Sequence, residues 1–283
     1  MTGAAGRIGW APPPGRPGGG GEAHRAASII AGLCGSLFLL FLVAPIARLV
    51  ATGGAAGVGK LVSDAELRSA LWLTAVTATT AMCVGALGGT PLAYLLARRD
   101  FRGRAVVAAV LDLPLLIPHP VAGIALLLML GRESVVGGVL LRAGIRVAGS
   151  PVGIVCAMVF VSAPLFISAA REAFARVDPR FESVARTLGD PAWRAFRRVT
   201  LPLSMRGLIA AAVVMWARAV SEFGAIVILT YNPKVASVLS YDRFTSFGLT
   251  EALPVAAVLT ILALVPLIAL RALRPDRGAG MDA

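Results

Sequence analysis

Six apolar segments of membrane length constrain this chain more than any other feature of its sequence. A helix of about 20 residues, rising about 1.5 Å per residue, crosses a hydrocarbon core roughly 30 Å thick. The six segments are residues 27–50, 71–96, 106–130, 151–168, 208–229 and 252–270. With 57% hydrophobic residues and a mean hydropathy of +0.81, the chain is too apolar for a soluble domain. We therefore predict an all-α integral membrane protein with six transmembrane helices.

The positive charges of the chain cluster in the polar segments between these apolar runs. A net charge of +12 is compatible with a nucleic-acid partner, but this distribution follows the positive-inside rule instead. With the N-terminus inside, the inner segments hold 18 of the 27 lysines and arginines, and the outer segments hold 8. We predict a multi-pass protein of the cytoplasmic (inner) membrane, embedded in the lipid bilayer, with both termini cytoplasmic and no nucleic-acid partner.

The segments outside the apolar runs divide the chain. Residues 1–26 are rich in glycine and proline and cannot bury a core, so we predict a disordered cytoplasmic tail. Residues 27–270 form the transmembrane domain, and residues 271–283 form a second cytoplasmic tail. Gly54 to Leu61 nearly matches a phosphate-binding loop, but it lacks the Ser or Thr that holds Mg²⁺ and follows a membrane span rather than a strand. We expect a flexible outer loop there, and no nucleotide site in this chain.

The longest polar stretch between two apolar runs, residues 177–202, carries the signals of a short helical hairpin. Asp178 supplies an N-cap oxygen, and Pro179 fits the first helical position, where no amide donor is needed. Gly189 stands where a glycine ends a helix. Apolar residues recur at helical spacing on both sides of that glycine. They are Phe181, Val184, Ala185 and Leu188 before it, and Trp193, Phe196 and Val199 after it.

The second half of this stretch repeats the pattern. Asp190-Pro191 is a second helix start, and Leu201-Pro202 is expected to close that helix. A hairpin with an exposed apolar face suits docking to a partner protein. Its five arginines are equally typical of an interfacial hairpin that lies on lipid headgroups. The residue pattern leaves both roles open.

The spacing of the hairpin resembles the cytoplasmic EAA loop of ABC importer permeases. That pattern reads E-A-A, three residues, G, nine residues, I-x-L-P. Here Ser183-Val-Ala precedes Gly189 by three residues, and nine residues separate Gly189 from Val199-Thr-Leu-Pro202. Ser183 occupies the place of the glutamate and Glu182 lies one residue earlier, so the role of that carboxylate is open. The resemblance implies a type I importer fold in which this loop is a coupling helix that docks on an ATPase subunit. The coupling residues it implies are Phe181, Glu182, Ala185, Leu188, Gly189, Trp193, Leu201 and Pro202.

Three prolines surround His119 in the third apolar run. Proline frees backbone carbonyls, and within a membrane this is tolerated only where protein or a water-filled cavity satisfies them. We predict a kinked or broken segment from Pro114 to Gly123, beside a transport pathway. Two roles are open for His119: contact with a substrate or gate, and a hydrogen bond to another helix, which is favoured.

The fifth apolar run holds Arg218 and Glu222, the two residues whose insertion into a membrane costs the most free energy. A central charge costs roughly 2.5–3.5 kcal/mol on insertion scales, so both should face protein or water. They suit a basic lining for an anion pathway, a charge clamp that holds a gate beside Phe223 and Gly224, or a structural ion pair at the subunit interface. They could pair with each other or with a partner on another helix or subunit. The pathway and gate residues predicted from these two runs are Pro118, His119, Pro120, Arg218, Glu222, Phe223 and Gly224.

Three further strings narrow the resemblance. A-R-A-V-S-E-F-G-A around Arg218 resembles permeases of the molybdate, tungstate and sulfate branch. The strings at residues 113–126 and 241–249 look most like the tungstate/molybdate type. This resemblance implies a homodimer that imports a tetrahedral oxyanion by alternating access. The partners it implies are two ATP-binding subunits, which hold ATP and Mg²⁺, and an extracytoplasmic protein that captures the oxyanion.

Other functions fit the sequence less well. A sulfate/thiosulfate permease would differ only in substrate, and residues 241–246 argue mildly against it. A secondary transporter would need no ATPase, but the internal repeat of broken helices typical of that class is not evident. A membrane enzyme would need a catalytic set, and we find no HExxH motif or paired His/Cys cluster. We therefore predict no catalytic residues, no metal site and no cofactor bound by this chain.

Overall fold

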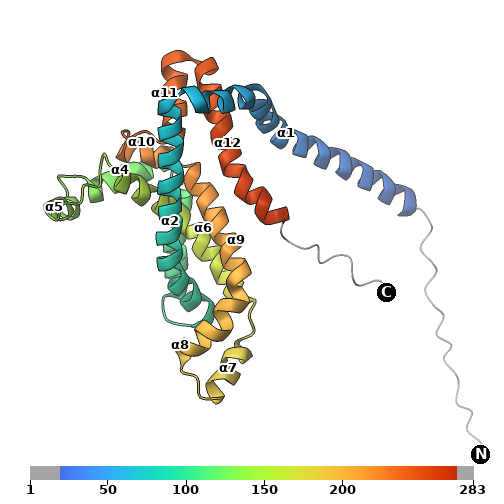
Figure 1. Cartoon of the computed structure of the whole chain (residues 1–283). Helices are drawn as coiled ribbons and strands as arrows, with labels where there is room; N and C mark the ends of the chain where they lie inside the picture. The colour runs from blue at the N-terminus through green and yellow to red at the C-terminus, as the bar shows by residue number, and fades with distance from the viewer. Residues whose placement is uncertain (1–19, 273–283) are drawn as a thin grey trace, which may run out of the picture. The chain divides into compact units, whose positions relative to one another are not determined.

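The computed structural model describes residues 20–272, and within that range it is helical, without β-strands (Figure 1). The predicted tail segments 1–19 and 273–283 lie outside the described residues. The elements are α1 (Gly20–Ser63), α2 (Ala65–Arg98), α3 (Arg104–Leu116), α4 (His119–Leu130), α5 (Val135–Arg142), α6 (Pro151–Ala175), α7 (Pro179–Thr187), α8 (Ala192–Ala195), the π-helical turn η1 (Phe196–Thr200), α9 (Leu201–Val220), α10 (Gly224–Leu229), α11 (Ala236–Phe247) and α12 (Leu249–Ala272).

Helix α1 is longer than predicted at both ends. It begins at Gly20, so residues 20–26 belong to a helix rather than to a disordered tail. Residues up to Arg48 and residues from Leu49 onward are two compact units. In the first unit the apolar side chains from Ile29 to Ile46 are exposed. Such a surface requires lipid or protein around it.

In the second unit, helices α2, α6 and α9 pack side by side and form the core (Figure 1). Gly85 and Gly89, one turn apart on α2, permit this close packing. A Cβ at Gly85 would lie 2.2 Å from Met215 Cε of α9, and one at Gly89 would lie 2.9 Å from Ile167 Cγ1 of α6. The small-residue spacing that the sequence shows at this place is therefore a helix contact.

The third apolar run is broken, as the prolines predicted. Helices α3 and α4 meet at an angle of 112°, and the break falls at Ile117 and Pro118. Five other helices among the described residues are long and apolar enough to span a membrane, and the bent pair makes a sixth if it is counted as one span. The prediction of six spans is confirmed in this sense.

The bounds predicted for the fifth span, 208–229, are wrong. Helix α9 starts earlier, at Leu201, and ends at Val220, and α10 begins only at Gly224. Beyond the end of α9, the Glu222 carboxylate accepts the Ala225 N–H at 2.9 Å and so satisfies an amide in the first turn of α10. Arg218 and Glu222 therefore lie at a second broken helix and not in the middle of a continuous one.

The flexible outer loop predicted at Gly54 to Leu61 is also wrong, because these residues are the last turns of α1. A glycine there allows direct contact with another helix. A Cβ at Gly57 would lie 2.6 Å from Pro254 O of α12, whereas a Cβ at Gly59 would meet nothing within 4 Å. Of the glycines in this near-match to a phosphate loop, Gly57 therefore serves close helix packing, and Gly59 does not.

This difference between two neighbouring glycines gives a testable prediction. We expect Gly57→Ala to destabilise the protein by about 1–3 kcal/mol, because the new methyl group meets backbone atoms that cannot move aside. Gly59→Ala, in the same helix, should be neutral. The measurement is the thermal unfolding midpoint of the detergent-solubilised protein, and equal midpoints for the two variants would contradict the packing described.

Candidate functional site: a coupling hairpin and a charged helix break

The helix–glycine–helix hairpin predicted at residues 177–202 is present at one end of the second unit (Figure 1). Asp178 caps α7 by accepting the Arg180 N–H at 2.8 Å, and Pro179 is the first helical residue. Gly189 ends the turn with φ +97°, a left-handed conformation that favours glycine. The signals for the first half of the hairpin are therefore confirmed.

The second half differs from the prediction. The α8 helix starts at Ala192, and Asp190 does not cap it but pairs with Arg194 at 3.4 Å. Leu201-Pro202 does not close the helix, which runs on through η1 into α9. The Leu201 N–H donates to Phe196 O, five residues back, and this wider turn places Pro202, which has no N–H, at the second position of α9.

One face of the hairpin presents large apolar side chains to the surroundings. They are Phe181, Val184, Leu188 and Trp193, each between 55% and 84% exposed. Ala185 is half-buried. Because a solvated helix normally turns such residues inward, this face suits contact with a protein or a lipid surface.

The opposite side of α7 is anchored to the helix core by Glu182. Its Oε2 accepts the Tyr94 hydroxyl at 2.7 Å, and its Oε1 accepts Arg98 Nε at 3.2 Å, both from the end of α2. The Thr200 hydroxyl of η1 donates to the same Oε1. Ser183, at the place of the family glutamate, only reaches the Pro179 carbonyl at 3.3 Å. The inward carboxylate is thus the polar link between the hairpin and α2.

Aromatic rings complete this anchor. Tyr94 lies 4.6 Å from Phe196 and 5.6 Å from Phe174 between ring centroids, both edge to face. Trp193 stacks on Phe196 at 5.6 Å. Contacts of this kind stabilise by about 0.5–1.5 kcal/mol beyond burial. The hairpin, α2 and α6 therefore meet in one aromatic cluster.

The predicted pathway residues come together where the two broken helices meet. Helix α4 packs against α10 with glycines at both contacts. A Cβ at Gly123 would lie 2.8 Å from Ala225 O, and one at Gly224 would lie 2.6 Å from His119 Cβ. Pro118 is the N-cap residue of α4 and Pro120 its second residue. Phe223 lies in the α9–α10 break and contacts the Tyr241 ring at 4.9 Å.

Three ionisable side chains occupy this junction. Arg218 Nη2 lies 2.8 Å from Glu222 Oε2 and also contacts His119 Nε2. His119 Nε2 lies 3.7 Å from Glu222 Oε2. The predicted helix-to-helix contact of His119 is therefore present, with Arg218. The pairing of Arg218 with Glu222 is present too, and it does not require a helical i, i+4 geometry because Glu222 lies beyond the helix end.

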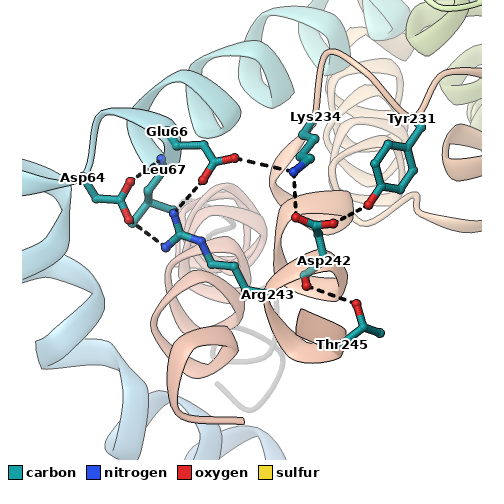
Figure 2. Close-up of polar contacts among 8 residues, drawn as sticks. All are labelled: Asp64, Glu66, Leu67, Tyr231, Lys234, Asp242, Arg243 and Thr245. Atoms are coloured by element: carbon teal, nitrogen blue, oxygen red, sulfur yellow. Dashed lines mark hydrogen bonds and ion pairs between the residues drawn. The ribbon is translucent and has the colours of Figure 1, made fainter. Parts of the chain in front are cut away.

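A third polar cluster lies at the opposite end of this unit from the hairpin, around the start of α2 and α11 (Figure 2). Arg243 reaches Asp64 at 2.7 Å and Glu66 at 3.1 Å. Lys234 reaches Asp242 at 2.6 Å and Glu66 at 3.7 Å. The chain of contacts ties the loop after α10 and helix α11 to the first turn of α2. Figure 2 also shows the Tyr231 hydroxyl pointing at Asp242.

Comparison with known proteins now assigns the family. Residues 89–275 match the family described as binding-protein-dependent transport system inner membrane component. The chain belongs to the permease family of ABC importers. A relative from Thermococcus kodakarensis, named molybdate/tungstate transport system permease protein WtpB, is 39% identical over 240 residues, which are 84% of this chain and 92% of the relative.

Two other matches concern the branch of the family and the fold. A sulfate transport system permease protein, CysT, from a Synechocystis species is 30% identical over 243 residues, covering 83% of this chain and 85% of that one. The permease is therefore more similar to the molybdate/tungstate relative than to this sulfate one. A solved bacterial ABC transporter involved in alginate import matches with a TM-score of 0.68 at 18% identity, over 89% of this chain and 96% of that one. This match shows the type I importer fold.

The sequence patterns missed several residues of these clusters. Tyr94 and Arg98 fall in the P-L-A-Y-L-L-A-R string at the end of the second span, and that string was a usable signal for the hairpin anchor. Asp242 and Arg243 fall in the Y-D-R-F-T-S string, but their partners Asp64 and Glu66 are far away in sequence. Within residues 20–272 no three His, Cys, Asp or Glu side chains are grouped as a metal site requires.

We expect Glu182→Gln to loosen the hairpin of this permease. The amide keeps the shape but weakens the charge-assisted bonds from Arg98 and Tyr94, by about 1–3 kcal/mol. Hydrogen exchange of residues 179–187 should therefore accelerate about fivefold or more, since 1 kcal/mol corresponds to a factor of about five. Glu172→Gln, at an exposed carboxylate on α6, is the matched control and should leave exchange unchanged. Unchanged exchange in both variants would contradict the anchor.

The polar cluster at the far end predicts a pH response. Lys234 and then Tyr231 hold the Asp242 pKa below its usual range, and Arg243 does the same to Asp64. Asp242 in turn raises the pKa of Lys234. A carboxyl group whose pKa is lowered stabilises the fold above its ordinary pKa of about 3.9, and this contribution is lost as the pH falls through the folded pKa. A lysine whose pKa is raised stabilises the fold below its ordinary pKa of about 10.4, and this contribution is lost as the pH rises through the folded pKa.

The cluster should therefore be intact from about pH 5 to pH 9 and weaken in acid below about pH 4. Hydrogen exchange of residues 236–247, corrected for the intrinsic rate, should show this loss of protection. Asp242→Asn should reduce the acid dependence and leave the part that the Asp64–Arg243 pair contributes, whereas Asp100→Asn, at an exposed carboxylate near α3, should leave it unchanged. An acid dependence in the Asp242 variant equal to that of the wild type would refute the assignment.

Proposed function

We propose that this permease is the membrane subunit of an ATP-driven importer for a tetrahedral oxyanion, molybdate or tungstate. The observation that carries the substrate class is the 39% identity, over 92% of its length, with a relative named molybdate/tungstate permease. The sulfate relative, at 30% identity, makes sulfate or thiosulfate the second candidate. All three substrate types are tetrahedral oxyanions, so one pathway chemistry serves each.

In this proposal the hairpin is the coupling element, and ATP is hydrolysed elsewhere. Two ATPase subunits, which hold ATP and Mg²⁺, dock on the exposed apolar face of α7 and α8. Leu188 and Trp193 are the most exposed residues of that face and are its central contacts. Glu182 then passes the movement of the hairpin to α2, and the continuous chain from η1 into α9 passes it to the helix break.

The pathway lies at the junction of α4 and α10, between two copies of the chain. The capture protein delivers the anion from the outside, and the break opens to one side of the membrane at a time. Selectivity belongs mainly to the capture protein, because a permease that bound the anion tightly between its two states would trap it. The arginine bias of the hairpin segment supports a cytoplasmic position for that segment and for both termini.

The direct test is element-resolved uptake in a strain that lacks this gene. Complementation with the wild-type gene should restore uptake of molybdenum or tungsten, measured by mass spectrometry, with sulfate followed by radiolabel. Restoration of sulfate uptake alone would support the importer function but show that the substrate is sulfate rather than molybdate or tungstate. If uptake of none of the three oxyanions returns, the proposed substrate class is wrong.

The same assay tests the hairpin. Leu188→Asp places a charge in the apolar face without touching the core, since the side chain is 84% exposed. We expect it to abolish uptake and to prevent co-purification of the ATPase. Val135→Asp, at an equally exposed residue on α5, should preserve both. If Leu188→Asp transports like the wild type, the hairpin is not the ATPase contact, whichever anion the permease carries.

A further inference from the structure

The carboxylate of Glu222 is the least expected group at the helix break. Its side chain is 1% exposed, and an unpaired charge is rarely so deeply buried. Oε1 is satisfied by the Ala225 N–H at 2.9 Å. Among the described residues, no hydrogen bond is directed at Oε2, although Arg218 Nη2 is only 2.8 Å away. The pair is thus held by charge rather than by well-aligned hydrogen bonds.

The neighbouring histidine shares the same guanidinium. His119 Nε2 contacts Arg218 Nη2 and lies 3.7 Å from Glu222 Oε2. The Glu222 carboxylate offsets the charge of the guanidinium, so an anion that approaches the Arg218–Glu222 pair meets no net positive charge.

Access to the group is one-sided. His119 is 40% exposed and Arg218 is 22% exposed, whereas Glu222 lies behind them. The two nitrogen-bearing side chains are therefore accessible at this junction, and the carboxylate is not. The carboxylate contacts the guanidinium from the buried side, and an oxyanion could approach the guanidinium from the accessible side.

We propose that Arg218 and His119 form a transient binding site for a divalent tetrahedral oxyanion, and that Glu222 is the built-in competing anion that keeps this site weak. The proposal rests on the oxyanion function proposed above. Glu222 neutralises Arg218 while the break is empty, and the passing anion takes over part of the guanidinium contact. Because the carboxylate stays tethered, it recaptures the arginine and expels the anion.

The structure offers a conservative variant for this site. Glu222→Gln keeps an oxygen for the Ala225 N–H, and the Ser237 hydroxyl still donates to the main-chain carbonyl at 2.7 Å. Only the negative charge is lost. The local fold of the break should therefore survive, and Arg218 should be left without its competing charge.

The first experiment measures equilibrium binding of radiolabelled molybdate to the permease–ATPase complex in nanodiscs, without the capture protein. Glu222→Gln should bind molybdate about tenfold more tightly or better than the wild type, since an opposing charge about 4 Å from the anion has been removed. Sulfate should compete. Glu172→Gln, at an exposed carboxylate, should bind as the wild type does. Wild-type affinity in a Glu222→Gln variant with an unchanged unfolding midpoint overturns the proposal.

A second variant separates this role from a purely structural ion pair. The double substitution Arg218→Gln with Glu222→Gln removes both charges at similar volume, a change that buried ion pairs often tolerate. A structural pair predicts that energised uptake survives, whereas a transient anion site predicts that uptake falls at least tenfold. Preserved uptake in the double variant would therefore refute the anion site but not the importer function. Absence of molybdate, tungstate and sulfate uptake in the wild type would instead refute the function on which the site rests.

Discussion

The contact between α4 and α10 is the interaction on which the rest of the structure depends. A broken helix within a membrane exposes backbone groups, and lipid cannot satisfy them. Within residues 20–272 we find two such breaks, one between α3 and α4 and one between α9 and α10, and α4 packs against α10. Gly123 and Gly224 allow backbone contact there, and Glu222 satisfies an amide that the break would leave free. Each break is tolerable because the other one covers it.

This junction and the hairpin lie at the two ends of one continuous stretch of chain. From Ala192 the chain is helical without interruption through α8, η1 and α9. Helix α9 ends at Val220, two residues after Arg218. Helix α2 runs alongside and is tied to the hairpin by Tyr94 and Arg98. A displacement of the hairpin can therefore reach the break through packed helices, which is the mechanical requirement of the proposed importer.

Local signals predicted local structure well. Asp178-Pro179 and Gly189 marked the hairpin because capping and left-handed turns depend on neighbours in sequence. The prolines around His119 marked the first break for the same reason. The end of α9 was missed because the apolar run from 208 to 229 continues straight through it.

Long-range partners explain the remaining errors. Gly57 was assigned to a loop because its contact with Pro254 lies almost two hundred residues away in the sequence. Glu182 was left without a role because its donors come from α2 and η1. The Asp64–Arg243 pair could not be predicted from spacing either. In each case the residue type was informative, but its partner was known only after the helices had packed.

The central claim is that this permease moves an oxyanion at the expense of ATP, and proteoliposomes test it most directly. The permease, its ATPase partner and the capture protein would be reconstituted together, and accumulation of labelled molybdate or tungstate would be measured with and without ATP. The account predicts accumulation against the gradient only when ATP and the ATPase are both present. Equal accumulation by the permease without the ATPase would contradict it and indicate a secondary transporter.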